Sequence, residues 1–336
     1  MKDKYALATL HSFGFPSSAN ALVSIDTVAN LQAQLSDVNH ANFYLLGEGS
    51  NTVFLEDYQG TVVKLAFRGV DFEQTDTHYL LKVGAGENWH QFVLWCMQHQ
   101  IYGLENLALI PGTVGAAPIQ NIGAYGVEIE QFIHDVDFYD LSNQSHLSLA
   151  RQGCEFAYRD SVFKNRLAEQ VVITSVTLAI PKKWQPVIHY GELKELSAPS
   201  PQNIFNKVIE LRQAKLPDPK KVGNAGSFFK NPIITLNHYT HLKKTWPSIP
   251  RYPVNNTNTV KVPAAWLIDT LGFKGKKNGG IGCHPSQPLV LTNDGTGTGE
   301  QLLALARDIK ASVFKEFSIT LENEVRLIGK HGPVIL

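Results

Sequence analysis

The spacing of hydrophobic residues along the chain predicts helices and strands that do not alternate regularly. Hydrophobic residues recur at helical spacing over 300–317 and 203–215, which are the clearest predicted helices. Segments 171–178 and 136–139 are runs of β-branched and aromatic residues, typical of buried strands. Because the two kinds of element are mixed without a regular order, the pattern favours an α+β fold over a doubly wound parallel sheet.

Shorter patterns predict further strands at 43–46, 61–65 and 78–83. A last strand is predicted at 321–328, where apolar and charged residues alternate. In that strand the charged residues, Glu324 among them, share one face and the apolar residues share the other. No internal repeat interrupts this order.

Capping residues predict where several helices begin and end. Asp26 is the predicted N-cap of an early helix, and Asn88 is the predicted N-cap of a helix that stops at Gly103. Pro263 opens a later helix, which stops at Gly272.

Two features of the chain suggest domain limits. The early helix and strands form a small α/β unit through about residue 68, and the Leu-Pro-Asp-Pro segment 216–219 is the best candidate for a domain boundary. A length of 336 residues is enough for two or three domains.

Composition restricts the kinds of partner and compartment. Thirty basic and thirty acidic residues cancel, so no general electrostatic field favours nucleic acid or an anionic membrane. No apolar run is long enough for a signal peptide or a membrane span. Cys96, Cys154 and Cys283 lie far apart, Cys96 within an apolar helical pattern, and none of the twelve histidines belongs to a dense metal-ligand motif. We therefore expect a cytoplasmic protein without a metal site.

Two loops rich in small residues are candidates for ligand binding. Segment 111–126 contains glycine, alanine and proline with almost no bulk, and segment 47–51 reads Gly-Glu-Gly-Ser-Asn between two predicted strands. Small residues let main-chain N–H groups approach a phosphate or pyrophosphate closely. The alternatives are a plain turn for the short loop and a packed backbone crossing for the long one. Neither loop matches the fingerprints G-x-G-x-x-G or G-x-x-x-x-G-K-[ST].

Three polar residues stand in settings that suggest chemistry. The guanidinium of Arg159 could clamp a carboxylate, or it could form a surface ion pair with Asp160. Ser227 precedes two phenylalanines that would give its hydroxyl a dry setting, although a turn residue is the alternative and no G-x-S-x-G elbow surrounds it. The alternative for Glu324 is a solvated cross-strand charge pair with Arg326.

The whole chain resembles the family of UDP-N-acetylenolpyruvoylglucosamine reductases, the flavoenzymes of bacterial peptidoglycan precursor synthesis. The segments that carry the resemblance are 47–51, 111–126, 158–161, 223–232, 264–268 and 321–326. The sequence His-Tyr-Gly-Glu-Leu at 189–193 is similar to the subtype of this family that has a mobile tyrosine loop over the substrate.

The resemblance implies a particular version of the α+β fold. It consists of a two-domain FAD-binding fold, like that of vanillyl-alcohol-oxidase-like (PCMH) flavoproteins, and a third α+β domain that binds the substrate. Residues 1–68 would form the first FAD-binding subdomain, and 69–217 the second, completed by a C-terminal strand at 319–336. Residues 218–318 would form the substrate-binding domain. FAD would lie between the first two.

The same resemblance assigns roles to individual residues. The catalytic residues are Arg159, Ser227 and Glu324. The FAD-binding residues are Gly47, Gly49, Ser50, Asn51, Pro111, Gly112, Thr113, Gly115, Ala116, Gln120, Asn121, Gly123, Ala124, Tyr125, Ile173 and Arg326. The substrate-binding residues are Tyr190, Lys215, Asn231, Tyr252 and Gln287. The chain departs from the family at Ala265, where glycine is usual, and at the two prolines of 284–288.

The implied reaction uses FAD as cofactor and NADPH as electron donor. It reduces the enolpyruvyl ether of a UDP-sugar to the lactyl ether, UDP-N-acetylmuramate. Arg159 and Glu324 would stabilise the enediolate that forms on the substrate, and Ser227 would protonate the adjacent carbon. The implied partners are therefore small molecules, and we expect a monomer.

Two other functions fit parts of the pattern. One is a different FAD-dependent oxidoreductase on the same fold, for example an alcohol oxidase that uses oxygen, because a fold does not fix a reaction. The other is a nucleotide-sugar-binding protein without redox chemistry. Oxygen consumption with a small alcohol would indicate the first, and a colourless protein that takes up no FAD would indicate the second.

Overall fold

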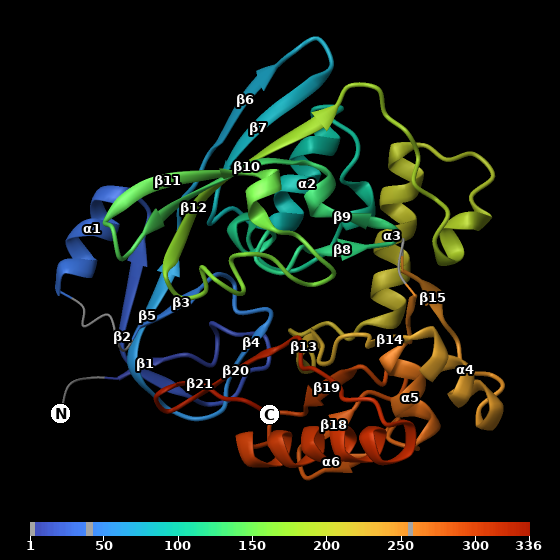
Figure 1. Cartoon of the computed structure of the whole chain (residues 1–336). Helices are drawn as coiled ribbons and strands as arrows, with labels where there is room; N and C mark the ends of the chain where they lie inside the picture. The colour runs from blue at the N-terminus through green and yellow to red at the C-terminus, as the bar shows by residue number, and fades with distance from the viewer. Residues whose placement is uncertain (1–3, 38–42, 255–257) are drawn as a thin grey trace. The chain divides into compact units, whose positions relative to one another are not determined.

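The computed structural model of the chain describes residues 4–37, 43–254 and 258–336. The chain divides into two compact units, each of which is described by itself (Figure 1). Unit one comprises the residues up to Asn20, Gly49–Gln59 and Lys215–Leu336, and unit two comprises Ala21–Glu48 and Gly60–Ala214.

The helices and strands have the following bounds. The helices are α1 (Val28–Asp37), α2 (Trp89–Gln98), α3 (Pro201–Lys215), α4 (Leu236–Thr245), α5 (Ala264–Thr270) and α6 (Gly299–Phe317). The first strands are β1 (Tyr5–Ala6), β2 (Ser18–Ile25), β3 (Phe43–Leu46), β4 (Thr52–Phe54), β5 (Tyr58–Leu65), β6 (Val70–Gln74), β7 (His78–Gly84), β8 (Gly123–Ala124), β9 (Val127–Glu128), β10 (Ile133–Asp140), β11 (Ser145–Ala150) and β12 (Val171–Pro181). The later strands are β13 (Gly223–Ser227), β14 (Ile233–Thr235), β15 (Tyr252–Pro253), β16 (Thr259–Lys261), β17 (Lys277–Asn278), β18 (Ile281–Cys283), β19 (Val290–Asn293), β20 (Arg326–Gly329) and β21 (Gly332–Pro333).

Unit two is built on a five-stranded antiparallel sheet in the order β11-β10-β12-β7-β6. Consecutive residues are buried over 136–139 of β10 and 171–176 of β12, so both faces of these strands are covered, and Val136 lies opposite Val176. Helix α2 contributes Trp89 and Phe92 to the same hydrophobic core, and α3 contributes Val208. The β-branched runs therefore form central strands because both helices and the sheet bury their apolar sides together.

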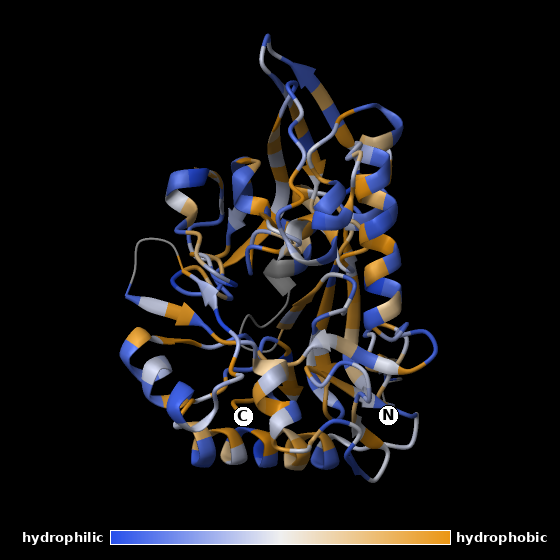
Figure 2. Ribbon diagram, turned by 90° about the vertical axis from the view of Figure 1, so that its right-hand side faces the viewer, coloured by the Kyte–Doolittle hydropathy of each residue, from blue (hydrophilic) through white to orange (hydrophobic). Residues whose placement is uncertain are grey.

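Unit one contains a four-stranded sheet in the order β13-β19-β18-β17, against which α6 packs (Figure 1). Thr298 and Gln301 form a capping box at the start of α6, which satisfies N–H groups of its first turn. Hydrophobic and hydrophilic residues alternate along this helix (Figure 2). Leu302, Leu305, Ile309, Val313 and Phe317 are buried, whereas Phe314 is exposed. This amphipathic pattern explains why 300–317 could be recognised from sequence.

The structure confirms most of the predicted elements. Strand β3 has the predicted bounds, and β7, β12, α3 and α6 each contain the segment predicted for them. The side chain of Asn88 accepts a hydrogen bond from the Gln91 N–H and is the N-cap of α2, as predicted. These predictions succeeded because each depended on local periodicity or a local cap.

Two predicted helix ends are wrong. Helix α1 begins at Val28, and the Thr27 hydroxyl accepts from the Asn30 N–H, so Thr27 occupies the capping position predicted for Asp26. The Asp26 carboxylate instead accepts a hydrogen bond from the side-chain amide of Asn30, so it does not cap the main chain of the helix. Helix α2 ends at Gln98 rather than near Gly103, because Gln100 has a positive φ of 58° that breaks helical geometry.

The last predicted strand is shorter than expected. Strand β20 begins at Arg326, and residues 321–325 precede it with one isolated bridge, between Asn323 and Phe229. Their alternating burial comes from packing of Leu321 and Val325 into the core of unit one. Strand β20 pairs in parallel with β4, whereas the sequence analysis assigns the C-terminal strand to the 69–217 subdomain. The division into three functional domains stays a prediction.

The three cysteines are free and buried. Burial raises the pKa of Cys96 far above its ordinary value and raises the pKa of Cys283 to about 11. A thiol with a raised pKa carries little thiolate at neutral pH and is a poor nucleophile. This agrees with the interpretation of Cys96 as a structural thiol.

A buried histidine in unit one predicts how stability depends on pH. The His11 side chain is 3 % exposed, and burial lowers its pKa from 6.5 to about 4. In the unfolded chain His11 therefore binds a proton below pH 6.5, whereas in the folded chain it does so only below about pH 4. The stability should be complete above pH 6.5 and should fall as the pH drops toward 4, by about 3 kcal/mol in all.

Urea unfolding between pH 8 and pH 4 measures this dependence. The variant His11→Asn should have a lower free energy of unfolding at pH 8 but a flatter pH dependence, because it lacks the titrating group. Replacing the exposed His331 with Asn is the matched control and should keep the slope of the wild type. Equal slopes in the wild type and His11→Asn would contradict the assignment.

Candidate active site

The short loop 47–51 crosses the division between the two units, and its second part belongs to unit one. Gly49 has a φ of +65°, and a Cβ added there would lie 2.0 Å from the Leu10 carbonyl oxygen. Both the backbone conformation and the close approach exclude other residues. The Ser12 N–H donates to the Gly49 carbonyl oxygen at 3.1 Å. The loop is thus fixed by its main chain rather than by side-chain packing.

Asn51, at the end of this loop, lies beside the segment that carries Glu324. The Asn51 side-chain amide donates to the Glu324 carbonyl oxygen at 3.2 Å, and the Arg326 N–H donates to the Asn51 carbonyl oxygen at 2.9 Å. The parallel pairing of Arg326 with Thr52 continues this contact into β4 and β20. Unit one therefore brings two predicted FAD-binding residues together with a predicted catalytic carboxylate.

Ser227 is the last residue of β13 and is half-buried. The two phenylalanines that follow it are each 1 % exposed, in agreement with the expected dry setting. Beside it, Gly226 has a φ of +71°, and a Cβ placed there would meet no atom within 4 Å. Open space therefore adjoins the main chain next to the serine.

Main-chain hydrogen bonds bring Ser227 and Glu324 together within unit one. The Glu324 N–H donates to the carbonyl oxygen of Phe228 at 2.8 Å, and the Lys230 N–H donates to the carbonyl oxygen of Glu322 at 2.9 Å. The segments 227–230 and 322–324 therefore run side by side. Two of the three predicted catalytic residues are neighbours across this pairing.

In unit two, Glu48 holds the first part of the short loop against the long loop 111–126. The Glu48 carboxylate accepts from the Asn88 side chain at 2.6 Å and from the Gly112 N–H at 3.1 Å. A Cβ on Gly47 would lie 2.9 Å from the Thr113 hydroxyl oxygen. Sequence reasoning did not select Glu48 for a role, although a carboxylate between two glycines is the signal that could have indicated it.

Arg159 also lies against the long loop in unit two. Its guanidinium donates to the Gly123 carbonyl oxygen at 2.7 Å and to the Asn121 carbonyl oxygen at 3.3 Å. Its backbone has a positive φ of 55°, which is uncommon for a residue other than glycine. The arginine predicted as catalytic is therefore in contact with residues predicted to bind FAD.

The side chain of Asn121 is used within the protein. Asn121 is fully buried with a φ of 42°; its amide donates to Ala157 O at 3.1 Å and its carbonyl oxygen accepts from the Glu130 N–H at 3.1 Å. The buried Asn106, which sequence reasoning missed, donates to Tyr125 O at 2.9 Å. The side-chain amides of Asn121 and Asn106 therefore hold the main chain of the long loop in place.

The predicted substrate-binding residues are divided between the units. Tyr190, in unit two, is 42 % exposed, and its ring meets the ring of Tyr125 edge-on at 6.3 Å. Lys215, Asn231, Tyr252 and Gln287 belong to unit one. Asn231 accepts from the Ala264 N–H at 2.9 Å at the start of α5, and Tyr252 is exposed on β15.

Gln287 lies in the turn where the chain departs from the family at two prolines. The ring nitrogen Nδ1 of His284 accepts from the N–H groups of Ser286 and Gln287, which closes the turn. The Oε1 atom of Gln287 is buried, and no hydrogen-bond partner for it lies among the described residues. A buried oxygen without a donor is costly, and the described residues supply none for Gln287.

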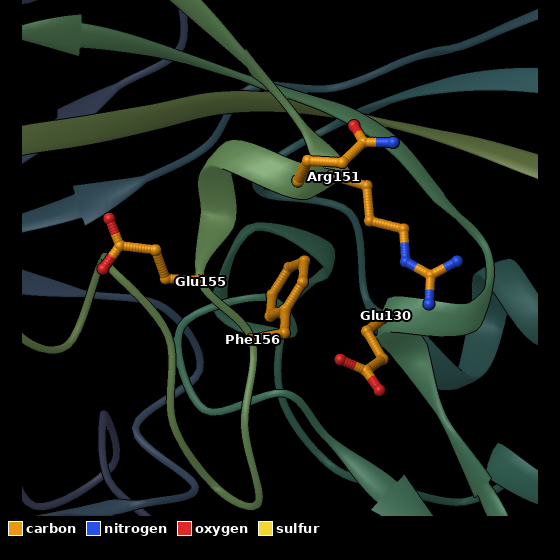
Figure 3. A pocket seen from close by; sticks show the side chains of 5 residues that line it. Glu130, Arg151, Glu155 and Phe156 are labelled. Carbon is orange, nitrogen blue, oxygen red and sulfur yellow. The ribbon is translucent and has the colours of Figure 1, made fainter.

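A surface pocket of about 390 Å³ lies elsewhere in unit two (Figure 3). It is lined by Glu130, Arg151, Gln152, Glu155 and Phe156, with side chains of both charges around one aromatic ring. The predicted site residues do not line it. We assign it no role in the reaction.

Two further observations concern the described residues. Among them, no group of three or more His, Cys, Asp or Glu residues is placed to hold a metal ion. None of the helices in residues 4–37, 43–254 and 258–336 has the length and hydropathy that crossing a membrane would require.

The two loops fit the pyrophosphate and flavin of FAD. Gly47, Gly49 and Gly115 stand where an added Cβ would collide with neighbouring protein atoms, so only glycine allows this close packing of the loops. Loops of small residues suit a diphosphate where their main-chain N–H groups are not used within the protein. Hydroxyl and amide groups of Ser50 and Gln120 provide further donors.

Comparison with known proteins agrees with this geometry. A model of the FAD binding domain matches residues 19–143, which include both loops, and a model of the UDP-N-acetylenolpyruvoylglucosamine reductase C-terminal domain matches residues 218–328. The crystal structure of UDP-N-acetylenolpyruvylglucosamine reductase from Thermus caldophilus is similar with a TM-score of 0.69 at 22 % identity, over 97 % of this chain and 98 % of that one.

Curated relatives are more similar in sequence. The UDP-N-acetylenolpyruvoylglucosamine reductase of Pseudoalteromonas atlantica is 57 % identical over 98 % of this chain and 96 % of its own length. That of Pseudoalteromonas translucida is 49 % identical over 98 % of this chain and 96 % of its own length.

The fold and its glycine-rich loops define a flavoprotein with the FAD-binding fold, and the cofactor is FAD. The α+β class predicted from the sequence is confirmed. The chain belongs to the UDP-N-acetylenolpyruvoylglucosamine reductase family, and the resemblance found in its motifs is confirmed with it.

Proposed function

We propose that this chain reduces the enolpyruvyl ether of UDP-N-acetylglucosamine enolpyruvate to the lactyl ether, with NADPH as electron donor, in peptidoglycan precursor synthesis. Family membership supports the reaction. The observation that carries the assignment of residues is the hydrogen bond from the Glu324 N–H to Phe228 O, because it makes Ser227 and Glu324 neighbours. A proton donor and an acidic partner are the groups that this reduction requires.

The proposal divides the site residues by ligand. FAD contacts are assigned to the residues of the two loops, together with Ile173 and Arg326. Substrate contacts are assigned to Tyr190, Lys215, Asn231, Tyr252 and Gln287, and the unpaired oxygen of Gln287 supports that assignment. Residues 1–68 and 69–217 are proposed to bind FAD, and 218–318 the UDP-sugar.

The chain's own residues control charge and proton transfer. When bound and reduced by NADPH, the flavin would supply the hydride that the vinyl carbon accepts. Arg159 offers a permanent cation to the substrate carboxylate, where negative charge accumulates as the enediolate forms. Glu324, if protonated, donates a second hydrogen bond to the same charge. Ser227 then gives its hydroxyl proton to the adjacent carbon, which completes the lactyl ether.

Steady-state turnover tests the proposed function. Oxidation of NADPH should depend on UDP-N-acetylglucosamine enolpyruvate, and the product should be heavier than the substrate by two hydrogen atoms. NADPH oxidation that is indifferent to the sugar nucleotide but consumes oxygen with a small alcohol would instead identify an oxidase. A protein that takes up no FAD would identify a binding protein without redox chemistry.

Oligomeric state and location complete the proposal. We infer a monomer in the cytoplasm. The balanced charge favours neither nucleic-acid nor membrane partners, and the three free cysteines suit a reducing compartment. Light scattering at micromolar concentration should give the mass of one chain, 37.2 kDa. A mass of twice that value would contradict the monomer.

A further inference from the structure

An N-terminal segment of unit one lies between the FAD loop and strand β13. This segment, residues 10–13, is called the N-terminal clasp below. A Cβ on Gly49 would lie 2.0 Å from Leu10 O, and a Cβ on Gly223 would lie 2.3 Å from Phe13 O. Glycine is therefore required on both sides of the clasp, because the backbones approach too closely for a side chain.

Ser12 is the residue of the clasp that bonds to both sides. Its hydroxyl lies 2.7 Å from Asn224 O, where it donates, and 3.3 Å from Ser50 O. Its main chain repeats the pattern: the Ser12 N–H donates to Gly49 O, and the Asn224 N–H donates to Ser12 O, each at 3.1 Å. One small residue thus connects the loop 49–51 to β13.

Asn224 extends this connection toward Ser227. Asn224 is 5 % exposed, and its side-chain carbonyl oxygen accepts from the Gly226 N–H at 3.0 Å. Its amide donates to Pro217 O at 3.1 Å and to Val222 O at 2.9 Å. The main chain at Gly226, immediately before the serine, is therefore held by a residue that Ser12 holds in turn.

We propose that Ser12 is a positioning residue that fixes the FAD loop Gly49–Asn51 relative to the strand ending in Ser227. The inference rests on the proposed function where it concerns the role of Ser227. The contact of Ser12 with the loop Gly49–Asn51 does not depend on that function. Ser12 touches neither the reacting atoms nor the cofactor in this account. Its effect passes through the carbonyl groups of Ser50 and Asn224.

The competing explanation is that the hydroxyl only supports the fold. Ser17 provides a matched control, because it follows the clasp closely in the chain and is buried, and its hydroxyl donates to the nearby Phe15 O. Ser17→Ala should lower the melting temperature and leave FAD binding and turnover at their wild-type values. A purely structural Ser12 would behave in the same way.

Two readouts separate the explanations. FAD is titrated into the full-length apoprotein by flavin fluorescence, and re-oxidation of the reduced holoenzyme by the enolpyruvyl sugar nucleotide is followed at 450 nm by stopped flow. Ser12→Ala should weaken FAD binding and slow re-oxidation, each by about tenfold, the scale of one buried hydrogen bond. Ser12→Thr, which keeps the hydroxyl, should restore both to within about twofold.

The test includes a second variant in case Ser12→Ala does not fold. Ser12→Cys keeps nearly the same shape but donates poorly, so it should show the same losses. Wild-type FAD affinity and re-oxidation in Ser12→Ala or Ser12→Cys, with only a lower melting temperature, would overturn the inference. If the wild type itself is not re-oxidised by the sugar nucleotide, the proposed function fails, and the FAD titration alone still decides the role of Ser12.

Discussion

Ser227→Ala should leave flavin reduction by NADPH at the wild-type rate and slow the reduction of the enolpyruvyl substrate by about a thousandfold, the middle of the range for a general acid. The reason is that the hydroxyl enters only when the carbon next to the new C–H bond must be protonated. Ser227 ends β13 next to two buried phenylalanines, which limit the approach of water from that side. Stopped-flow absorbance at 450 nm resolves the two half-reactions.

Two further variants sharpen this result. Ser227→Cys retains a proton donor and should recover part of the lost rate, whereas Ser312→Ala removes a hydroxyl from the exposed face of α6 and should change neither half-reaction. Trapping experiments in D₂O should also show incorporation of solvent deuterium at the protonated carbon in the wild type. Equal rates in Ser227→Ala and wild type, in both half-reactions, would remove the serine from the mechanism.

Arg159→Ala should slow the reduction of the enolpyruvyl substrate by at least about a hundredfold, the usual scale for one group that stabilises a developing anion. Arg159→Lys should recover only part of the rate, because lysine keeps the charge but loses the planar, bidentate geometry. Arg166→Ala is the matched control: its guanidinium forms an exposed ion pair with Glu155 at 3.0 Å, and its loss should be without effect.

The contacts of Arg159 require one more measurement. Since the guanidinium also holds the carbonyl oxygens of Asn121 and Gly123, its removal would loosen the long loop 111–126. The electrostatic account predicts that FAD affinity and the NADPH half-reaction fall by far less than the substrate half-reaction. If both fall as much as the substrate half-reaction, Arg159 acts on the loop rather than on the substrate carboxylate.

The elements that sequence patterns predicted well are those that a local rule decides. The amphipathic repeat of α6 and the cap at Asn88 are properties of neighbouring residues, and they hold whatever the rest of the chain does. The 321–325 segment shows the limit of such rules. Its alternation resembles a strand, yet its main-chain bonds go to Asn51 and to the residues after Ser227, which no periodicity reveals.

The site shows the same division. Small residues in the two loops indicated where backbone meets ligand, and the motif match indicated Arg159, Ser227 and Glu324. The residues that hold the loops and β13 in place were not predicted. Glu48, Asn106 and Ser12 act through contacts with segments far away in the sequence. A lone serine or carboxylate carries no signal of such a contact, because its partner is chosen by tertiary packing.

The most direct test of the account is anaerobic re-oxidation of the reduced holoenzyme. After one equivalent of NADPH has bleached the flavin absorbance at 450 nm, UDP-N-acetylglucosamine enolpyruvate should restore it without oxygen, with formation of one equivalent of UDP-N-acetylmuramate. Absorbance that stays bleached until air is admitted would contradict the proposed reaction.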